Sequence, residues 1–251
     1  MGFFHELRSR LELYFAFTTK EVRDILICVV VSAFIFSFND WGRAGQFDLI
    51  IGFKNMLLVA LLTALAFFVH LSFQRVMALM IGFKAEFKVW WGGLIASFLI
   101  VFITASIFNL GFTVILPGGM VIAMLVRHRL GEFRYGVNYW ENGIIALWGP
   151  IGTMILALIF KILLIIFPHS WFLQKGLLIN LIYGVCSMLP IPPLDGINVF
   201  FAGRVLFAAS FGIILGIALL IYWANLWITI FGGILIGLVI WLLFFLYIEP
   251  K

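Results

Sequence analysis

The feature that most restricts the fold of this chain is a series of long apolar stretches with almost no charged residues. Residues 226–248, for example, contain no Asp, Glu, Lys or Arg. Over the 251 residues only 11% are charged, against about 25% in an ordinary soluble protein, so the chain lacks the side chains to cover a water-facing surface. The stretches also lack the strict alternation of outer-membrane barrel strands. We therefore predict an α-helical polytopic membrane protein.

Apolar stretches of helical length are spaced along the whole chain. They lie at about 25–38, 52–74, 93–109, 141–167, 172–189, 205–222 and 226–248. Because a membrane-spanning helix needs about 20 apolar residues, these stretches predict six or seven membrane crossings, and we expect about six transmembrane helices. The largest polar gap, residues 127–141, is too short to fold by itself. Residues 25–251 are therefore expected to form a single membrane domain.

The N-terminal 24 residues differ from the stretches that follow. They interleave basic with apolar side chains, which predicts an interfacial amphipathic helix over residues 1–24. Thr18 or Thr19 is expected to cap the next helix. Basic segments are typical of the cytoplasmic side of a membrane, so we predict that the N-terminus faces the cytoplasm.

This orientation predicts the depth of two distant polar residues. The second span returns to the cytoplasmic side and brings His70 there. If the segment around Pro117 re-enters the membrane, the three arginines between residues 127 and 134 lie on the cytoplasmic side as well. Two further helices then go out and return, so the break that holds Asp195 ends on the same side. His70 and Asp195 are therefore expected at one membrane depth.

Two segments have the pattern of strands. In Phe83–Trp91 apolar residues alternate with charged ones up to Lys88, which predicts a strand. Gly111–Met124 contains Pro117 and further glycines among β-branched residues, and it is expected to be extended. Non-helical backbone at membrane depth is tolerated only beside protein or a water-filled cavity. We therefore predict a short membrane-embedded β element that belongs to a site.

Three ionisable side chains lie within apolar spans: His70, Lys161 and Asp195. Such residues cost about 2.5–3.5 kcal/mol at a helix centre, so they mark interior or hydrated positions. Lys161 is expected to snorkel to the membrane interface along its long stem. Asp195 follows the Pro-rich stretch 190–193 and precedes Gly196, which predicts a helix broken at the Pro-Pro-Leu-Asp-Gly turn with a carboxylate at the break. The alternative is an ordinary interfacial loop in which Asp195 caps the next helix.

These polar positions resemble the motifs of a known family. Residues 180–196, NLIYGVCSMLPIPPLDG, resemble the second signature of the site-2 proteases, intramembrane zinc metalloproteases in which an aspartate equivalent to Asp195 binds zinc. Residues 67–90 resemble the family's metal-binding helix and the strand after it, with His70 at the first histidine of H-E-x-x-H. Residues 141–160 resemble the small-residue helix start between the two motifs. The resemblance covers most of the chain and implies the family's membrane-embedded fold.

Three positions depart from the family pattern. In the family motif, the glutamate beside the first histidine is the general base, and the second histidine binds zinc. These positions are Leu71, which cannot accept a proton, and Gln74, whose amide is a poor zinc ligand. Ser187 replaces an asparagine that in the family can hydrogen-bond the substrate carbonyl. The resemblance therefore implies a remnant metal site, His70 and Asp195, that holds no zinc.

These departures predict a catalytically inactive pseudoprotease without a cofactor. By analogy with the family, it is expected to bind transmembrane segments of other proteins within the lipid bilayer. The expected contacts are Ser187 and the strand residues Phe87 and Val89, because an edge of the strand at 83–91 is suited to β-strand addition. Nucleic acid is excluded as a partner, since the basic residues are scattered between apolar blocks.

Two other functions fit the same residues. The first is an active intramembrane zinc metalloprotease in which Gln74 or another residue completes the ligand set. The second is a structural membrane subunit without a peptide groove. Without a metal ion, His70 and Asp195 are expected to form a buried polar contact that fixes the broken helix.

Overall fold

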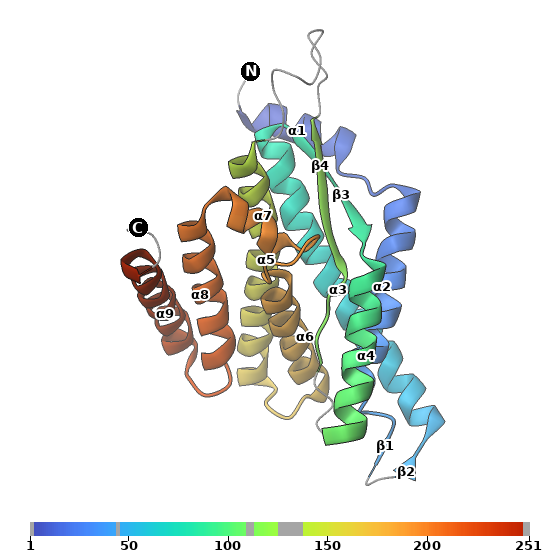
Figure 1. Cartoon of the computed structure of the whole chain (residues 1–251). Helices are drawn as coiled ribbons and strands as arrows, with labels where there is room; N and C mark the ends of the chain where they lie inside the picture. Colours follow the sequence, from blue (N-terminus) through green and yellow to red (C-terminus); the bar gives the residue numbers. More distant parts are fainter. Residues whose placement is uncertain (1–2, 44–45, 109–112, 125–137, 248–251) are drawn as a thin grey trace.

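The computed structural model describes residues 3–43, 46–108, 113–124 and 138–247, and this part of the chain is mostly helical (Figure 1). The helices are α1 (Phe3–Tyr14), α2 (Thr19–Ser37), α3 (Leu49–Ile81), α4 (Trp91–Phe108), α5 (Tyr139–Ile166), α6 (Trp171–Ser187), α7 (Asp195–Ala202), α8 (Arg204–Leu220) and α9 (Leu226–Tyr247). The strands are β1 (Gly42–Arg43), β2 (Gln46–Phe47), β3 (Phe83–Val89) and β4 (Gly118–Met124).

Within the described residues, three helices are long and apolar enough to cross a membrane: Leu49–Ile81, Tyr139–Ile166 and Leu226–Leu246. Trp91–Ala105 and Arg204–Leu220 are apolar but shorter. Large apolar side chains are exposed along these helices, such as Leu61 at 65%, as a lipid-facing surface requires. The protein is therefore a mostly helical membrane protein, and the figure of six transmembrane helices stays a prediction.

The N-terminal segment contains two helices. α1 ends at Tyr14, and Thr18 caps α2. The Thr18 side chain accepts a hydrogen bond from the Glu21 amide, and the Glu21 carboxylate accepts one from the Thr18 amide. This reciprocal capping box confirms that Thr18 starts the helix. Residues 19–24, predicted as part of the amphipathic segment, belong to α2 instead.

The predicted strand at 83–91 is present as β3. Gly82 ends α3 with φ of 99°, a left-handed conformation that a side chain would strain. β3 pairs antiparallel with β4, from Phe83 opposite Met124 to Val89 opposite Gly118. Residues 113–117, before β4, carry no helix. Residues 111–112 of the predicted extended segment, and the arginines between 127 and 134, lie outside the described residues.

The helices pack in a row in which α3, α5 and α6 are central (Figure 1). α2 lies against α3 and β3 on one side, and α8 and α9 lie on the other. α8 and α9 approach closely because Gly212 faces Gly237 and Gly216 faces Gly233, in each case with a Cβ position 3.0 Å from the facing Cα. The central row buries the α3 face that carries His70 and Gln74.

Candidate functional site

The site is built around a direct contact between two distant residues. His70 lies on α3 and Asp195 is the first residue of α7, and the structure places His70 Nε2 2.8 Å from Asp195 Oδ2. Both side chains are almost fully buried, at 1% and 3% exposure. The imidazole N–H donates to the carboxylate, a charge-assisted geometry. The buried polar contact expected from the sequence is therefore present.

Packing from two other helices holds the imidazole in place. Tyr183 on α6 stacks on the His70 ring with centroids 4.4 Å apart and an interplanar angle of 27°. The same tyrosine stacks on Phe67, one turn earlier on α3. On the other side, a Cβ at Gly149 of α5 would overlap His70 Nε2. Only glycine therefore lets α5 approach α3 this closely.

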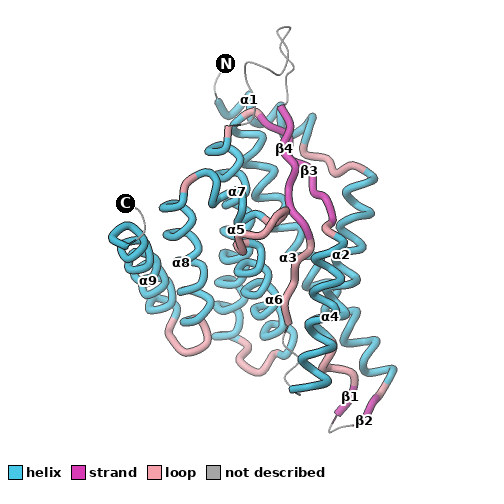
Figure 2. Tube along the Cα trace, in the orientation of Figure 1, coloured by secondary structure: helices cyan, strands magenta, loops and turns pink. Residues whose placement is uncertain are grey.

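Asp195 reaches the site through the break between α6 and α7. α6 ends at Ser187 and α7 begins at Asp195. A Cβ at Gly196 would overlap the Met188 carbonyl, so the chain folds back tightly over the end of α6. A Cβ at Gly119 of β4 would likewise overlap the Pro193 carbonyl, and Figure 2 shows this loop extending from the helices toward β4. The break thus lies between the helical row and the sheet.

The residues beside His70 do not complete a metal site. Leu71 is buried at 1% exposure. Gln74 donates its amide Nε2 to the Ala146 carbonyl at 3.1 Å. No group of three His, Cys, Asp or Glu side chains lies together anywhere in the described residues.

The contact distance indicates a hydrogen bond. Two ligands of one tetrahedral zinc lie about 3.4 Å apart when each bond is about 2.1 Å, longer than the 2.8 Å between His70 Nε2 and Asp195 Oδ2. The donor set also lacks the third strong ligand that a catalytic zinc uses. The described residues therefore do not fit a catalytic zinc.

Three buried polar atoms of the site have no hydrogen-bond partner among the described residues: His70 Nδ1, Asp195 Oδ1 and Gln74 Oε1. Each such atom costs about 1–3 kcal/mol when it is desolvated without a partner. Within the described part of the chain, the His70–Asp195 bond is the polar contact that these two side chains make.

The other predicted contact residues lie near the site but are engaged by the protein. Ser187 ends α6, and its hydroxyl donates to the Gly184 carbonyl at 3.0 Å. Phe87 is 2% exposed, and its backbone N–H donates to Glu21 Oε1 at 2.9 Å. Val89, at the end of β3, is half-buried. Because α2 closes the outer edge of β3 at Phe87, the expectation that β3 offers the open edge is corrected.

A buried ion pair near the site was missed by sequence reasoning. Arg75 of α3 is 1% exposed and pairs with Glu21 of α2. Its guanidinium also donates to the Phe15 and Ala16 carbonyls, at 2.9 Å each, and lies 4.1 Å from the centre of the Phe17 ring. This cluster ties the α1–α2 connection to α3, and through Glu21 to β3.

Comparison with known proteins agrees with the motif resemblance. The chain is 33% identical over 186 residues to a curated protein of Methanocaldococcus jannaschii, named "Putative zinc metalloprotease MJ0611". The matched region covers 72% of this chain and 84% of the relative. No family model and no solved structure matches the chain. The chain belongs to the site-2 protease family, as a member in which the H-E-x-x-H positions are His70, Leu71 and Gln74.

Proposed function

We propose that this chain is a catalytically inactive site-2-protease-like membrane protein that binds membrane-embedded segments of partner proteins. The proposal is based on the residues around His70: Leu71 occupies the general-base position, and His70 bonds directly to Asp195. General-base catalysis needs a group that accepts a proton. A catalytic zinc needs three protein ligands and one open position. The described residues around His70 supply neither.

We further propose a multi-pass arrangement with about six transmembrane helices, and with the N-terminus and the His70–Asp195 pair toward the cytoplasm. Its support is the three long apolar helices, together with the shorter apolar helices Trp91–Ala105 and Arg204–Leu220. The basic residues of α1, such as the exposed Arg8, favour a cytoplasmic N-terminus. In this arrangement residues 25–251 form one membrane domain with a β element inside it.

The proposed binding edge is that of β4. In an antiparallel pair, backbone groups alternate between pointing to the partner strand and pointing away. The Phe87 N–H points to Glu21, away from β4, so the facing residue Met120 directs its own backbone groups away from β3. Ile122, two residues on, has the same orientation. An extended segment of a partner can add to β4 through these groups.

The surroundings of β4 support an apolar partner. Val121 is 45% exposed and Ile122 is half-buried. Pro193 borders the start of the strand at Gly119, so a segment added to β4 would run beside the break that holds Asp195. In this proposal, the bound segment lies next to the His70–Asp195 pair.

A photocrosslinking experiment tests the proposal. The probe is a synthetic transmembrane peptide of Leu and Ala with a central Gly-Pro pair, which can unwind into an extended segment. A photoreactive residue is placed at Val121, and the matched control carries it at Ile159 on α5, which is equally exposed at 46% against 45%. We expect crosslinking at position 121 well above that at 159.

The variant Ile122→Pro sharpens this test, because it removes an outward-pointing N–H while the bonds between β3 and β4 are retained. It should abolish the preference for position 121. Equal crosslinking at both positions would favour the structural-subunit alternative, and cleavage of the peptide would favour the active-protease alternative.

A further inference from the structure

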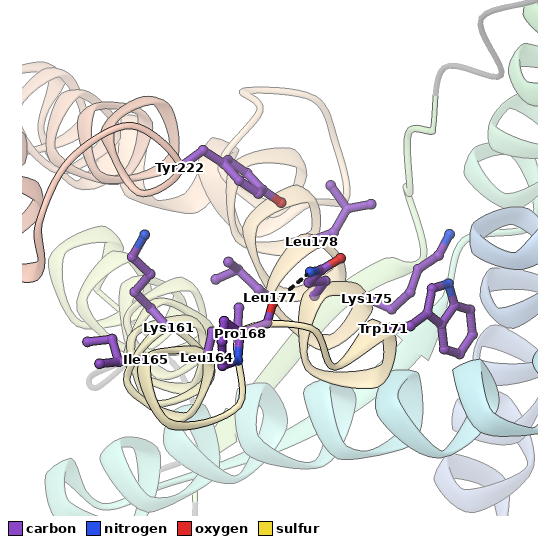
Figure 3. Close-up of a pocket in the computed structure, with 10 residues that line it drawn as sticks. Lys161, Leu164, Ile165, Pro168, Trp171, Lys175, Leu177, Leu178 and Tyr222 are labelled. Atoms are coloured by element: carbon purple, nitrogen blue, oxygen red, sulfur yellow. Dashed lines mark hydrogen bonds between the residues drawn. The ribbon is translucent and has the colours of Figure 1, made fainter.

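A second polar feature lies far from the His70–Asp195 pair. A pocket of about 610 Å³ opens between the end of α5, the start of α6 and the turn between α8 and α9 (Figure 3). Lys161 on its wall is twelve residues beyond Gly149 on α5, or about 18 Å along the helix. The pocket is therefore separate from the site described above.

Lys161 is the unsatisfied charge of this pocket. Its side chain is half-buried, and no hydrogen bond or ion pair to it is found within the described residues. Lys175, the other lysine of the pocket, is by contrast engaged, with Asp40 at 2.6 Å and the Phe36 carbonyl at 3.1 Å. A cation next to apolar surface is stabilised by an anion, so the pocket has room and charge for an anionic group at Lys161.

Further features of the pocket favour an anion. Tyr222, from the α8–α9 turn, has a hydroxyl that can donate a hydrogen bond. Figure 3 shows the side chains of Tyr222 and Lys161 beside the same pocket, each from a different segment of the chain. The start of α6 forms part of the wall, and the positive end of a helix dipole favours negative charge. Gln174 donates to the Pro168 carbonyl at 3.2 Å, which holds the connection between α5 and α6 in place.

The rest of the pocket is suited to hydrocarbon. Leu164, Ile165, Leu177 and Leu178 supply apolar walls. Leu178 is seven residues into α6 and therefore lies deeper in the membrane than Lys161, which is five residues from the end of α5. An acyl chain would lie against this surface. A soluble anion would gain nothing from it.

The depth of Lys161 fits a lipid headgroup. α5 ends at Ile166, five residues after Lys161, which is about 7 Å of helix. The headgroup region is about 5–7 Å thick on each side of the hydrocarbon core. Trp171 and Tyr222 also line the pocket, and such residues are enriched at membrane interfaces.

We propose that this pocket binds an anionic phospholipid, with the phosphate at Lys161 and Tyr222 and an acyl chain along Leu178. The site lies at the end of the helices opposite to α1, so in the proposed orientation it takes a lipid of the outer leaflet. A basic pocket between transmembrane helices is a recognised form of headgroup site.

The test measures lipid binding to the full-length chain purified in detergent, by native mass spectrometry. Phosphatidylglycerol is compared with phosphatidylcholine and with inorganic phosphate. One lysine near an anionic headgroup contributes about 1 kcal/mol, which is about a fivefold preference for phosphatidylglycerol. Lys161→Gln should remove this preference, and Lys161→Arg should keep it.

The matched control is Lys54→Gln, which makes the same charge change at an exposed residue on α3 and should leave the preference intact. Tyr222→Phe keeps the aromatic ring and should reduce the preference in part. A preference that survives Lys161→Gln would overturn the proposal. So would inorganic phosphate that binds as tightly as the lipid, because the acyl surface would then contribute nothing. If Lys161→Gln fails to fold, the outcomes for Lys161→Arg and Tyr222→Phe decide in the same way.

Discussion

The His70–Asp195 contact makes a directional prediction about stability. Three variants test it: His70→Ala, Asp195→Ala and the double variant. Both side chains are buried, and the 2.8 Å bond between them is the polar contact that each makes within the described residues. Each single variant therefore leaves its partner buried without a hydrogen bond, whereas the double variant removes both members of the pair.

The magnitudes differ between the two single variants. His70→Ala leaves the Asp195 carboxylate alone in the interior, and removing one partner of a buried charged pair costs about 3–5 kcal/mol. Asp195→Ala leaves the buried His70 imidazole without its hydrogen-bond partner, and its cost is about 1–3 kcal/mol. We expect the double variant to cost no more than His70→Ala alone. The coupling energy between the two positions is then at least the cost of Asp195→Ala, about 1–3 kcal/mol.

The assay is unfolding by sodium dodecyl sulfate in mixed micelles, followed by tryptophan fluorescence. His169→Ala is the matched control, because His169 is exposed in the loop between α5 and α6 and should change the free energy of unfolding by less than about 0.5 kcal/mol. Additive costs in the double variant would show that the two side chains are not coupled. Single variants as stable as the control would show that the His70–Asp195 bond does not stabilise the fold.

Three further predictions use the same unfolding assay or a metal-binding assay. Gly149→Ala should cost about 1–3 kcal/mol by overpacking against His70, although alanine is the better helix former; an unchanged or higher stability would contradict this close packing. Arg75→Met should lower the free energy of unfolding by about 3–5 kcal/mol, because it leaves the Glu21 carboxylate buried without its cation. A loss below about 1 kcal/mol would show that the pair is not buried in the purified protein. The double variant Leu71→Glu with Gln74→His restores the family motif and should bind zinc in equilibrium dialysis. Leu71→Glu alone should not bind zinc. A folded double variant without zinc would show that α3 lacks the family geometry.

The sequence predicted the parts of the site that local patterns encode. Alternation of apolar and charged residues predicted β3, and Thr18 was expected to cap α2 as one of two candidates. The Pro-rich break predicted that the helix containing Ser187 ends before Asp195. The loop charges then predicted a shared depth for His70 and Asp195, which the structure shows in contact.

Contacts between distant segments were beyond the sequence. Arg75 and Glu21 are 54 residues apart, and each by itself has the composition of an interfacial charge. Only tertiary packing brings the two side chains together. The same packing lets Glu21 accept a hydrogen bond from the Phe87 N–H, which closes the edge of β3 there. Tyr183 was similarly missed, because an aromatic residue in an apolar helix gives no sign that it stacks on His70. Its position within the second family signature was the one available signal.

The central claim is that this family member holds no catalytic zinc, and the most direct test is the zinc content of the purified chain by elemental analysis, with cleavage of a transmembrane reporter measured in parallel. We expect zinc far below one ion per chain and no cleavage, because His70 and Asp195 bond to each other and Leu71 replaces the base. Stoichiometric zinc together with cleavage that a chelator abolishes would contradict it.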